Sequence, residues 1–284
     1  MTVAEALVLG SERIEAGMAA SSPRLDAEVL LCHITKWTKT ELHCRINDPI
    51  KQGVKREFEE LVQKRETGLP VAYLTGWKDF FSRRFQIQPG VLVPRPETET
   101  LVEEALALLR RSPGATRILD LCCGSGCIGI TLALETLSST VTLSDVCDQA
   151  LRQSEENKAL FGVSARVEIQ KSDLFSSLPR KAFDLIVSNP PYVGTEFGPE
   201  PDPEVLAHEP RRALFSGPHG TEILRKIIKE APLYLIEGGS LIMECASFQA
   251  ETVEAWMSDR GYDQTGLWHD LSGLPRGVSG RWEG

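Results

Sequence analysis

The sequence predicts a mostly parallel, doubly wound α/β domain that follows a small bundle of helices. From residue 116 onward, short apolar segments alternate with segments of helical periodicity, and this pattern is typical of a parallel sheet covered by helices. Residues 1 to about 75 instead place apolar side chains at spacings of three and four, without strand-like alternation. A short stretch of alternating residues between the two regions predicts a linking β-hairpin.

The first region, residues 1–78, is assigned to a helical domain. Leu30, Leu31 and Ile34 share one face of a helix expected over 25–35. Pro49 interrupts the pattern, and a new helix is expected over 51–66.

The linker, residues 79–97, is expected to form the β-hairpin. Phe81, Phe85 and Ile87 lie among polar residues in an alternating pattern, and Pro89-Gly90 supplies a turn before the apolar segment 91–93.

The remaining residues, 98–284, are expected to form the α/β domain. A helix is predicted from Glu97 to Leu109, and residues 267–282 can supply a final pair of strands. The strands are predicted at 116–121, 140–144, 166–170, 183–188 and 239–245, with helices near 127–136, 148–160, 220–235 and 247–259.

Composition and charge exclude several classes of protein. The 284 residues carry a net charge of −9, and 42% are hydrophobic, with no apolar run long enough to span a membrane. The N-terminus has no basic segment ahead of an apolar one, so we expect no signal peptide and a cytoplasmic location. Residues 1–80 contain 12 acidic and 11 basic residues, so the other 204 contain 28 and 20. That acidic balance disfavours a nucleic-acid partner.

The seven cysteines form no CxxC pair and no ligand spacing with histidine, so we assign none to a metal. They are interpreted as free thiols in a reducing compartment.

A glycine loop follows the first predicted strand. Asp120 and Leu121 end that strand, Cys122-Cys123-Gly124-Ser125-Gly126 follows, and Cys127 opens a helix. A strand, a glycine turn and a helix N-terminus form a cradle for a nucleotide-like ligand. Gly124 and Gly126 would let the backbone approach that ligand closely.

An acid ends the next strand and narrows the choice of ligand. Asp145 can accept hydrogen bonds from both hydroxyls of a ribose. The loop lacks a third glycine and a Gly-Lys-Ser/Thr sequence, so NAD and ATP are less favoured than S-adenosylmethionine. We expect Asp120 near the methionine amino group, Asp173 and Leu174 beside the adenine, and the cofactor to reach as far as Asn189.

The fourth strand runs directly into Asn189-Pro190-Pro191-Tyr192, a tetrapeptide suited to catalysis. The two prolines remove two backbone donors, which leaves the Pro190 carbonyl and the Asn189 side-chain oxygen as acceptors. Together they can receive both hydrogens of a planar NH₂ group and orient its nitrogen toward a methyl donor. Tyr192 can stack against a flat substrate. Amide and nucleobase nitrogens both fit this description.

The chain resembles the release factor glutamine methyltransferase family, also called PrmC or HemK, over nearly its whole length. The likeness is carried by residues 65–76, by 90–99 with its Pro94-Arg95-Pro96-Glu97-Thr98-Glu99 core, by 209–215, and by Asn189–Tyr192. It differs at Cys122 and Cys123, where family members usually have glycine and often threonine, and at Leu174, where some have an aromatic residue. A Cβ at Cys122 would restrict a left-handed backbone there. We expect its thiol to pack away from the cofactor.

The resemblance implies a Rossmann-like class I methyltransferase domain that uses S-adenosylmethionine and releases S-adenosylhomocysteine. The substrate would be the glutamine of the Gly-Gly-Gln motif in class I peptide chain release factors, methylated on its amide nitrogen, N5. Asn189, Pro190, Pro191 and Tyr192 would bind the glutamine and carry the catalysis. The helical domain of residues 1–78 would help to bind the release factor. We expect a monomer.

Two alternatives compete with this hypothesis. Enzymes that methylate the exocyclic amines of adenine N6 or guanine N2 face the same planar nitrogen and use the same motif. The acidic balance, the absence of a recognisable target-recognition domain and the Pro94–Glu99 segment favour a protein substrate. A non-catalytic binding module is disfavoured because Asp145 and Asn189–Tyr192 are intact.

Overall fold

The computed structural model describes residues 1–18, 22–111 and 114–284, which form two compact units. The first unit comprises Met1–Trp77, Ile87–Pro89 and Glu200–Glu209, and the second comprises the rest of the chain. Segment 200–209 therefore packs with the first unit although it lies far along the sequence. The domain boundaries at 78/79 and 97/98 stay a prediction.

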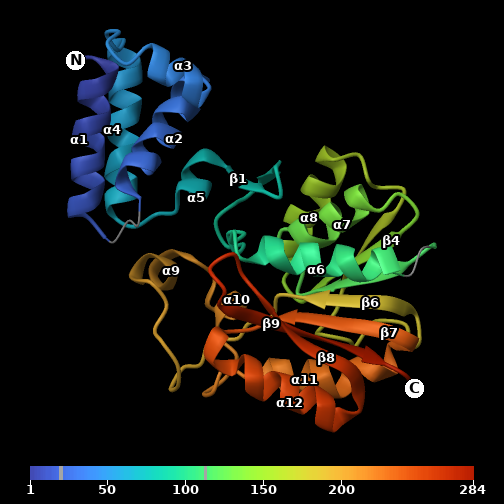
Figure 1. The fold of residues 1–284 in the computed structure, drawn as a ribbon. Coiled ribbons are helices and arrows are strands. Elements are labelled where there is room, and N and C mark those ends of the chain that lie inside the picture. The colour runs from blue at the N-terminus through green and yellow to red at the C-terminus, as the bar shows by residue number, and fades with distance from the viewer. Residues whose placement is uncertain (19–21, 112–113) are drawn as a thin grey trace. The chain divides into compact units, whose positions relative to one another are not determined.

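The first unit is a helical bundle built around apolar side chains. Leu7, Leu30, Leu31, Phe58 and Val62 form its core. Two of its helices begin with a capping box, at Thr2 and at Thr38, where a threonine and a glutamate satisfy each other's backbone N–H groups. The helices are α1 (Val3–Ala16), α2 (Pro23–Thr35), α3 (Lys39–Cys44), α4 (Gln52–Glu66), α5 (Val71–Thr75) and α9 (Pro203–His208) (Figure 1).

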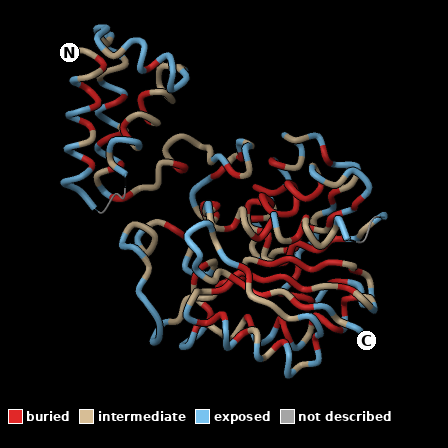
Figure 2. Tube along the Cα trace, viewed as in Figure 1, coloured by how far each residue is buried: buried red, intermediate tan, exposed pale blue. Residues whose placement is uncertain are grey.

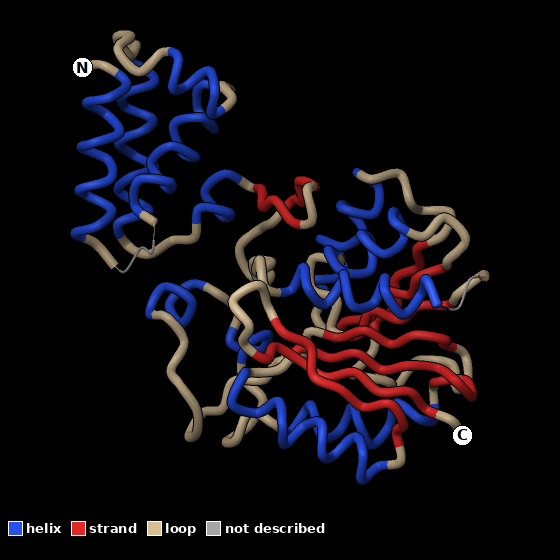
Figure 3. Tube along the Cα trace, viewed as in Figure 1, coloured by secondary structure: helices blue, strands red, loops and turns tan. Residues whose placement is uncertain are grey.

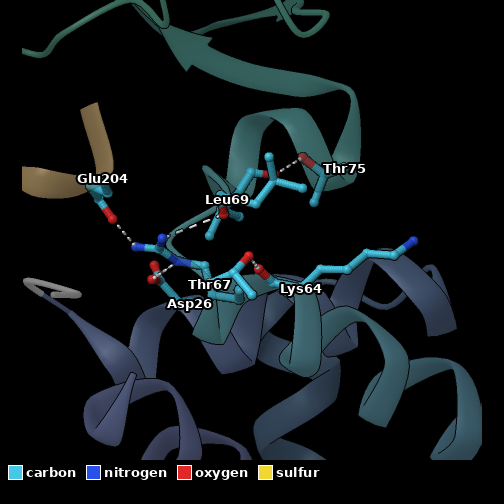
Figure 4. Close-up of polar contacts among 8 residues, drawn as sticks. Asp26, Lys64, Thr67, Leu69, Thr75 and Glu204 are labelled. Carbon is cyan, nitrogen blue, oxygen red and sulfur yellow. Dashed lines mark hydrogen bonds and ion pairs between the residues drawn. The ribbon is translucent and has the colours of Figure 1, made fainter. Parts of the chain in front are cut away.

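A buried arginine joins three segments of this unit. Arg65 of α4 is only 4% exposed, and its Nε donates to Asp26 of α2 at 2.8 Å. One terminal nitrogen donates to Glu204 of α9 at 2.6 Å, and the other to the Leu69 carbonyl at 3.4 Å (Figure 4). The guanidinium thus links α4 to both α2 and α9. Arg65 and Glu204 are 139 positions apart in the sequence.

Replacing Arg65 by methionine is expected to lower the free energy of unfolding of this bundle by about 3 kcal/mol, because two partly buried carboxylates lose their partner. Hydrogen exchange of α2 and α4 peptides measures the change. Arg13→Met is the control, since Arg13 and Glu66 form an exposed pair whose loss costs about 1 kcal/mol or less. Equal effects of the two substitutions would contradict the bridging role.

The predicted hairpin exists, but its turn lies elsewhere. Strands β1 (Trp77–Phe80) and β2 (Arg83–Gln86) form a two-stranded sheet, and Phe81-Ser82 makes the turn with φ values of 49° and 58°. Residues 91–93 are not a strand. A turn does lie at Pro89-Gly90, but it follows the hairpin, so the prediction that it joins the two strands was wrong. Glu99 accepts a hydrogen bond from the Phe81 backbone N–H at 2.9 Å, which supports a turn that lacks the usual asparagine or glycine.

The second unit contains a seven-stranded, mostly parallel sheet, as the sequence predicted. The strand order is β5-β4-β3-β6-β7-β9-β8, in which only β9 and β8 introduce antiparallel pairs (Figure 3). The strands are β3 (Arg117–Leu121), β4 (Thr140–Asp145), β5 (Val167–Lys171), β6 (Phe183–Ser188), β7 (Leu235–Glu244), β8 (Tyr262–His269) and β9 (Pro275–Trp282).

Helices cover both faces of this sheet, so its central strands β3 and β6 are buried along most of their length (Figure 1). Figure 2 shows the central strands as the most continuously buried part of the unit. Helices α6, α7 and α8 lie on one face, and α11 and α12 on the other. The helices are α6 (Thr98–Arg111), α7 (Cys127–Glu135), α8 (Asp148–Leu160), α10 (Arg211–Leu214), α11 (Glu222–Glu230) and α12 (Ala250–Arg260), with 3₁₀ turns at Ala231–Leu233 and Ser247–Gln249.

No helix among the described residues is both long and apolar enough to cross a membrane.

Candidate active site

The register of the parallel strands brings their carboxyl ends to one edge of the sheet. Leu121 of β3 pairs with Ser144 of β4 and with Ser188 of β6, and Ser188 pairs with Met243 of β7. The residues that follow each of these positions therefore meet at this edge, where doubly wound sheets bind ligands. They are Cys122, Asp145, Asn189 and Glu244.

A cavity of about 250 Å³ opens at this edge. Most of the residues expected to bind a cofactor or a substrate lie in its wall: Cys122, Cys123, Gly124, Ser125, Asp145, Asp173, Leu174, Asn189 and Pro191. Asp120, Gly126, Pro190 and Tyr192 do not line it.

The glycine loop leaves room for a ligand. Gly124 has a φ of 56°, and a Cβ built there would meet no atom within 4 Å, so a side chain would extend into open space. Gly126 has a φ of 78° and a different role, because its Cβ would lie 3.0 Å from the side chains of Ile130 and Leu143. Gly124 thus keeps the cavity open, and Gly126 allows the loop to pack on the sheet. The loop fits the cofactor that the sequence predicts.

Cys122 adopts the left-handed backbone that its side chain disfavours, with a φ of 63°. The residue is half-buried and lines the cavity, and its side chain packs against the apolar core of the unit, so the expectation that the thiol lies away from the ligand stays a prediction. Burial, and then the nearby Asp145, raise the pKa of the Cys122 thiol, which keeps it protonated and unreactive.

Cys122→Gly is expected to change the free energy of unfolding by less than about 1 kcal/mol, because release of the left-handed strain offsets the greater flexibility of glycine in the unfolded chain. Cys123→Gly is the matched control. Cys123 is 4% exposed and has no such strain, so the same change there should cost more than about 1 kcal/mol. Thermal unfolding of both variants measures the difference, and an equal loss would argue against strain at Cys122.

Asp120 lies behind the loop and is not among the residues that line the cavity, and its expected contact with a methionine amino group stays a prediction. Its Oδ2 accepts a hydrogen bond from the backbone N–H of Gly129 in α7 at 2.8 Å. Its Oδ1 is buried with no hydrogen-bond partner among the described residues, and burial raises the pKa of Asp120 to about 7. Alternation along β3 turns this side chain toward α7, where it fixes the helix behind the glycine loop.

Asp145 sits where the sequence placed it, at the end of β4 in the cavity wall. One carboxylate oxygen accepts from the Gly124 N–H at 3.0 Å and the other from the Cys147 N–H at 2.8 Å. Burial raises the pKa of Asp145, and these hydrogen bonds and the positive charge of Arg212 oppose that rise. Each oxygen keeps a further lone pair, so the carboxylate can still accept from a ligand.

Asn189 follows β6, and its side chain is held by its neighbours. Its Nδ2 donates to the Thr98 hydroxyl at 3.1 Å, and that hydroxyl donates to Glu244 at 2.7 Å. The Tyr192 hydroxyl donates to the other oxygen of Glu244 at 3.0 Å. Neither the Asn189 side-chain oxygen nor the Pro190 carbonyl accepts a hydrogen bond from any residue that the structure describes. The Asn189 oxygen is thus available to a ligand in the cavity, whereas Pro190 is buried and does not line the cavity.

Some of the cavity wall was missed by the assignments from sequence. Arg95 and Thr98 come from the Pro94–Glu99 segment, Arg212 from the 209–215 segment, and Lys226 from α11. The first two segments were noted only for their likeness to a family, and the structure shows that both line the same cavity. Glu244 had a usable signal, because like Asp145 it is an acid that ends an apolar strand.

Comparison with known proteins identifies the family. Residues 5–76 match the model of the PrmC N-terminal domain, and residues 98–198 match the methyltransferase small domain. The release factor glutamine methyltransferase of Leptospira interrogans is 36% identical over 259 residues, which cover 90% of each chain. That of Rhodopirellula baltica is 38% identical over 266 residues, covering 92% of this chain and 90% of its own.

The chain belongs to the release factor glutamine methyltransferase family. The resemblance noted from the sequence is thereby confirmed, and so is the class of enzyme. A solved methyltransferase from Pyrococcus furiosus has a TM-score of 0.51 and 17% identity, and it covers 72% of this chain and 91% of its own. At that identity the likeness shows the methyltransferase fold alone. Within the family, the individual site residues stay a prediction.

Proposed function

We propose that the protein transfers a methyl group from S-adenosylmethionine to the amide nitrogen, N5, of the glutamine in the Gly-Gly-Gln motif of class I peptide chain release factors. The observation that carries the proposal is the position of Asn189 in the cavity wall, with its Nδ2 engaged by Thr98 and its oxygen available. Family membership supplies the substrate class.

The residues that would hold the cofactor follow the contour of the cavity. Gly124 and Ser125 would contact it through the backbone, Asp145 would accept the ribose hydroxyls, and Leu174 would cover the adenine. When bound, S-adenosylmethionine supplies an electrophilic methyl group on a positively charged sulfur.

The protein's own contribution is the orientation of a weak nucleophile. A glutamine amide nitrogen is planar because its lone pair is delocalised into the carbonyl. The Asn189 oxygen and the Pro190 carbonyl would accept its two hydrogens, which aligns the nitrogen and favours the pyramidal shape it needs to attack. The nitrogen becomes far more acidic as it gains a fourth substituent, so it loses its extra proton to solvent without a strong base.

Mass spectrometry of a class I release factor incubated with the enzyme and S-adenosylmethionine tests the proposal. We expect a gain of one methyl group on the Gly-Gly-Gln glutamine, and none when that glutamine is replaced by asparagine. An unmodified release factor together with methylated DNA or RNA in a parallel reaction would instead support the exocyclic-amine alternative.

Because release factors act on cytoplasmic ribosomes, we also propose a cytoplasmic enzyme, and one that works as a monomer.

A further inference from the structure

Two buried residues outside the Asn189–Tyr192 motif form hydrogen bonds with its side chains. Thr98 begins α6 and Glu244 ends β7, and they are 2% and 3% exposed. The Thr98 hydroxyl lies between the Glu244 carboxylate and the Asn189 amide, at 2.7 Å and 3.1 Å. These contacts form a chain of hydrogen bonds from a buried carboxylate to the catalytic amide.

The direction of each hydrogen bond in this chain is dictated by chemistry. An ionised carboxylate only accepts, so the single hydrogen of the Thr98 hydroxyl must be donated to Glu244. The hydroxyl oxygen can then only accept from Asn189, and it must receive the NH₂ end of the amide. The two ends of an asparagine amide have nearly the same shape, so a partner of fixed polarity is needed to distinguish them.

We propose that Glu244, acting through Thr98, is a positioning residue that sets which end of the Asn189 amide faces the substrate nitrogen. The inference rests on the proposed function, in which the Asn189 oxygen accepts a hydrogen from a substrate NH₂ group. A reversed amide would present its own NH₂ group instead, and two donors would then face each other. The chain of bonds prevents that reversal.

The same carboxylate also holds the far end of the motif. Its second oxygen accepts from the Tyr192 hydroxyl at 3.0 Å, while the Gln249 side chain donates to the Tyr192 carbonyl at 3.0 Å. Glu244 therefore contacts Tyr192 directly and Asn189 through one hydroxyl. A single buried group thus fixes both ends of the tetrapeptide, and the two prolines between them add rigidity.

The charge of Glu244 is balanced by groups from several elements. Burial is the main factor that raises the pKa of Glu244, and the negative charge of Glu97, just before α6, adds to it. The hydroxyls of Thr98 and Tyr192 and the positive charge of Arg276 on β9 oppose the rise. The negative charge of Glu244 in turn raises the pKa of the Tyr192 hydroxyl, which stays protonated and able to donate.

This arrangement predicts an acid limb in the pH profile of turnover. As the pH falls through the raised pKa of Glu244, the carboxyl group gains a hydrogen that it can donate to Thr98. The polarity of the chain is then no longer fixed, and kcat should fall at a pH above the usual range for glutamic acid. A variant with an uncharged amide at this position should lack that limb.

Two substitutions test the positioning role. In Glu244→Gln, the amide can donate to Thr98 and invert the chain without a change of shape, and Thr98→Val removes the hydroxyl but keeps the volume. We expect each to lower kcat about 100-fold, the order of loss that a misplaced catalytic group produces. The dissociation constant for S-adenosylmethionine should change less than about twofold, because neither residue would supply its main contacts. Thr98→Ser keeps the hydroxyl and should retain most of the wild-type kcat. Glu237→Gln, at an exposed acid of β7, should leave kcat unchanged.

The outcomes separate this inference from the proposed function. Wild-type kcat in both Glu244→Gln and Thr98→Val would overturn the inference, and if Glu244→Gln fails to fold, the two Thr98 variants decide alone. If the wild-type enzyme does not methylate a release factor, the proposed function fails first. Nuclear magnetic resonance of the Asn189 side-chain NH₂ then provides an independent reading. Its hydrogens should be protected from exchange in the wild type and lose that protection in Glu244→Gln, and equal protection would overturn the inference.

Discussion

Replacing Asn189 by alanine is expected to reduce kcat by at least about 100-fold, the scale seen when one preorganised group that stabilises a transition state is removed. The substitution removes the acceptor that would orient the substrate amide, while the Pro190 carbonyl alone cannot hold both hydrogens. Cofactor affinity should stay within a few-fold of the wild type, since the glycine loop and Asp145 are untouched. Single-turnover methylation of a release factor measures the first quantity, and calorimetry with S-adenosylmethionine measures the second.

A distant control distinguishes this effect from a general loss of stability. Asn47→Ala changes the same residue type at an exposed position of the first unit and should leave turnover unchanged. Asn189→Asp keeps two acceptor oxygens but loses the donor to Thr98 and places a second carboxylate near Glu244. It should therefore also be impaired. If Asn189→Ala retained wild-type turnover, the pair of acceptors would not be the basis of catalysis.

The sequence predicted the sheet well because buried parallel strands leave a strong local signal. The expected strands at 116–121, 140–144, 166–170 and 183–188 agree with the observed ones within one residue at each end. The strand expected at 239–245 begins earlier in the structure, at Leu235. The prediction missed this start because Gly238 and Gly239 interrupt the apolar run. The hairpin turn at Phe81-Ser82 was missed because neither residue favours a positive φ, and support from Glu99 is invisible in a local pattern.

The site was predictable to the extent that it lies at strand ends. The ends of β3, β4 and β6 could be read from apolar runs, and this placed the glycine loop, Asp145 and Asn189 together. The contacts of Thr98 could not be read in this way, because 146 residues separate it from Glu244 and 91 from Asn189. The contact of Asp120 with the Gly129 N–H could not be read from the sequence either, because it depends on the packing of α7.

The cofactor assignment predicts that Asp145→Ala weakens S-adenosylmethionine binding by about 100-fold, which corresponds to about 2.7 kcal/mol. A carboxylate that accepts two ribose hydroxyls makes charge-assisted hydrogen bonds, and such bonds contribute about 1.5–3 kcal/mol each. Isothermal titration calorimetry measures the change directly. The nearby Asp148→Ala is the control, because Asp148 is exposed and pairs with Lys171 instead of lining the cavity.

A second variant separates contact with the ribose from support of the loop. Asp145 also accepts from the backbone N–H groups of Gly124 and Cys147, so its removal loosens the glycine loop as well. Asp145→Asn keeps one oxygen for the loop but cannot accept from both hydroxyls, and we expect an intermediate loss of about tenfold in affinity. The fold loss of affinity caused by Asp145→Asn is then measured for S-adenosylmethionine and for its 2′-deoxy analogue. If the two losses were equal, the carboxylate would act only on the loop. If the substitution weakens binding of the deoxy analogue less than it weakens binding of S-adenosylmethionine, the ribose 2′-hydroxyl contacts Asp145.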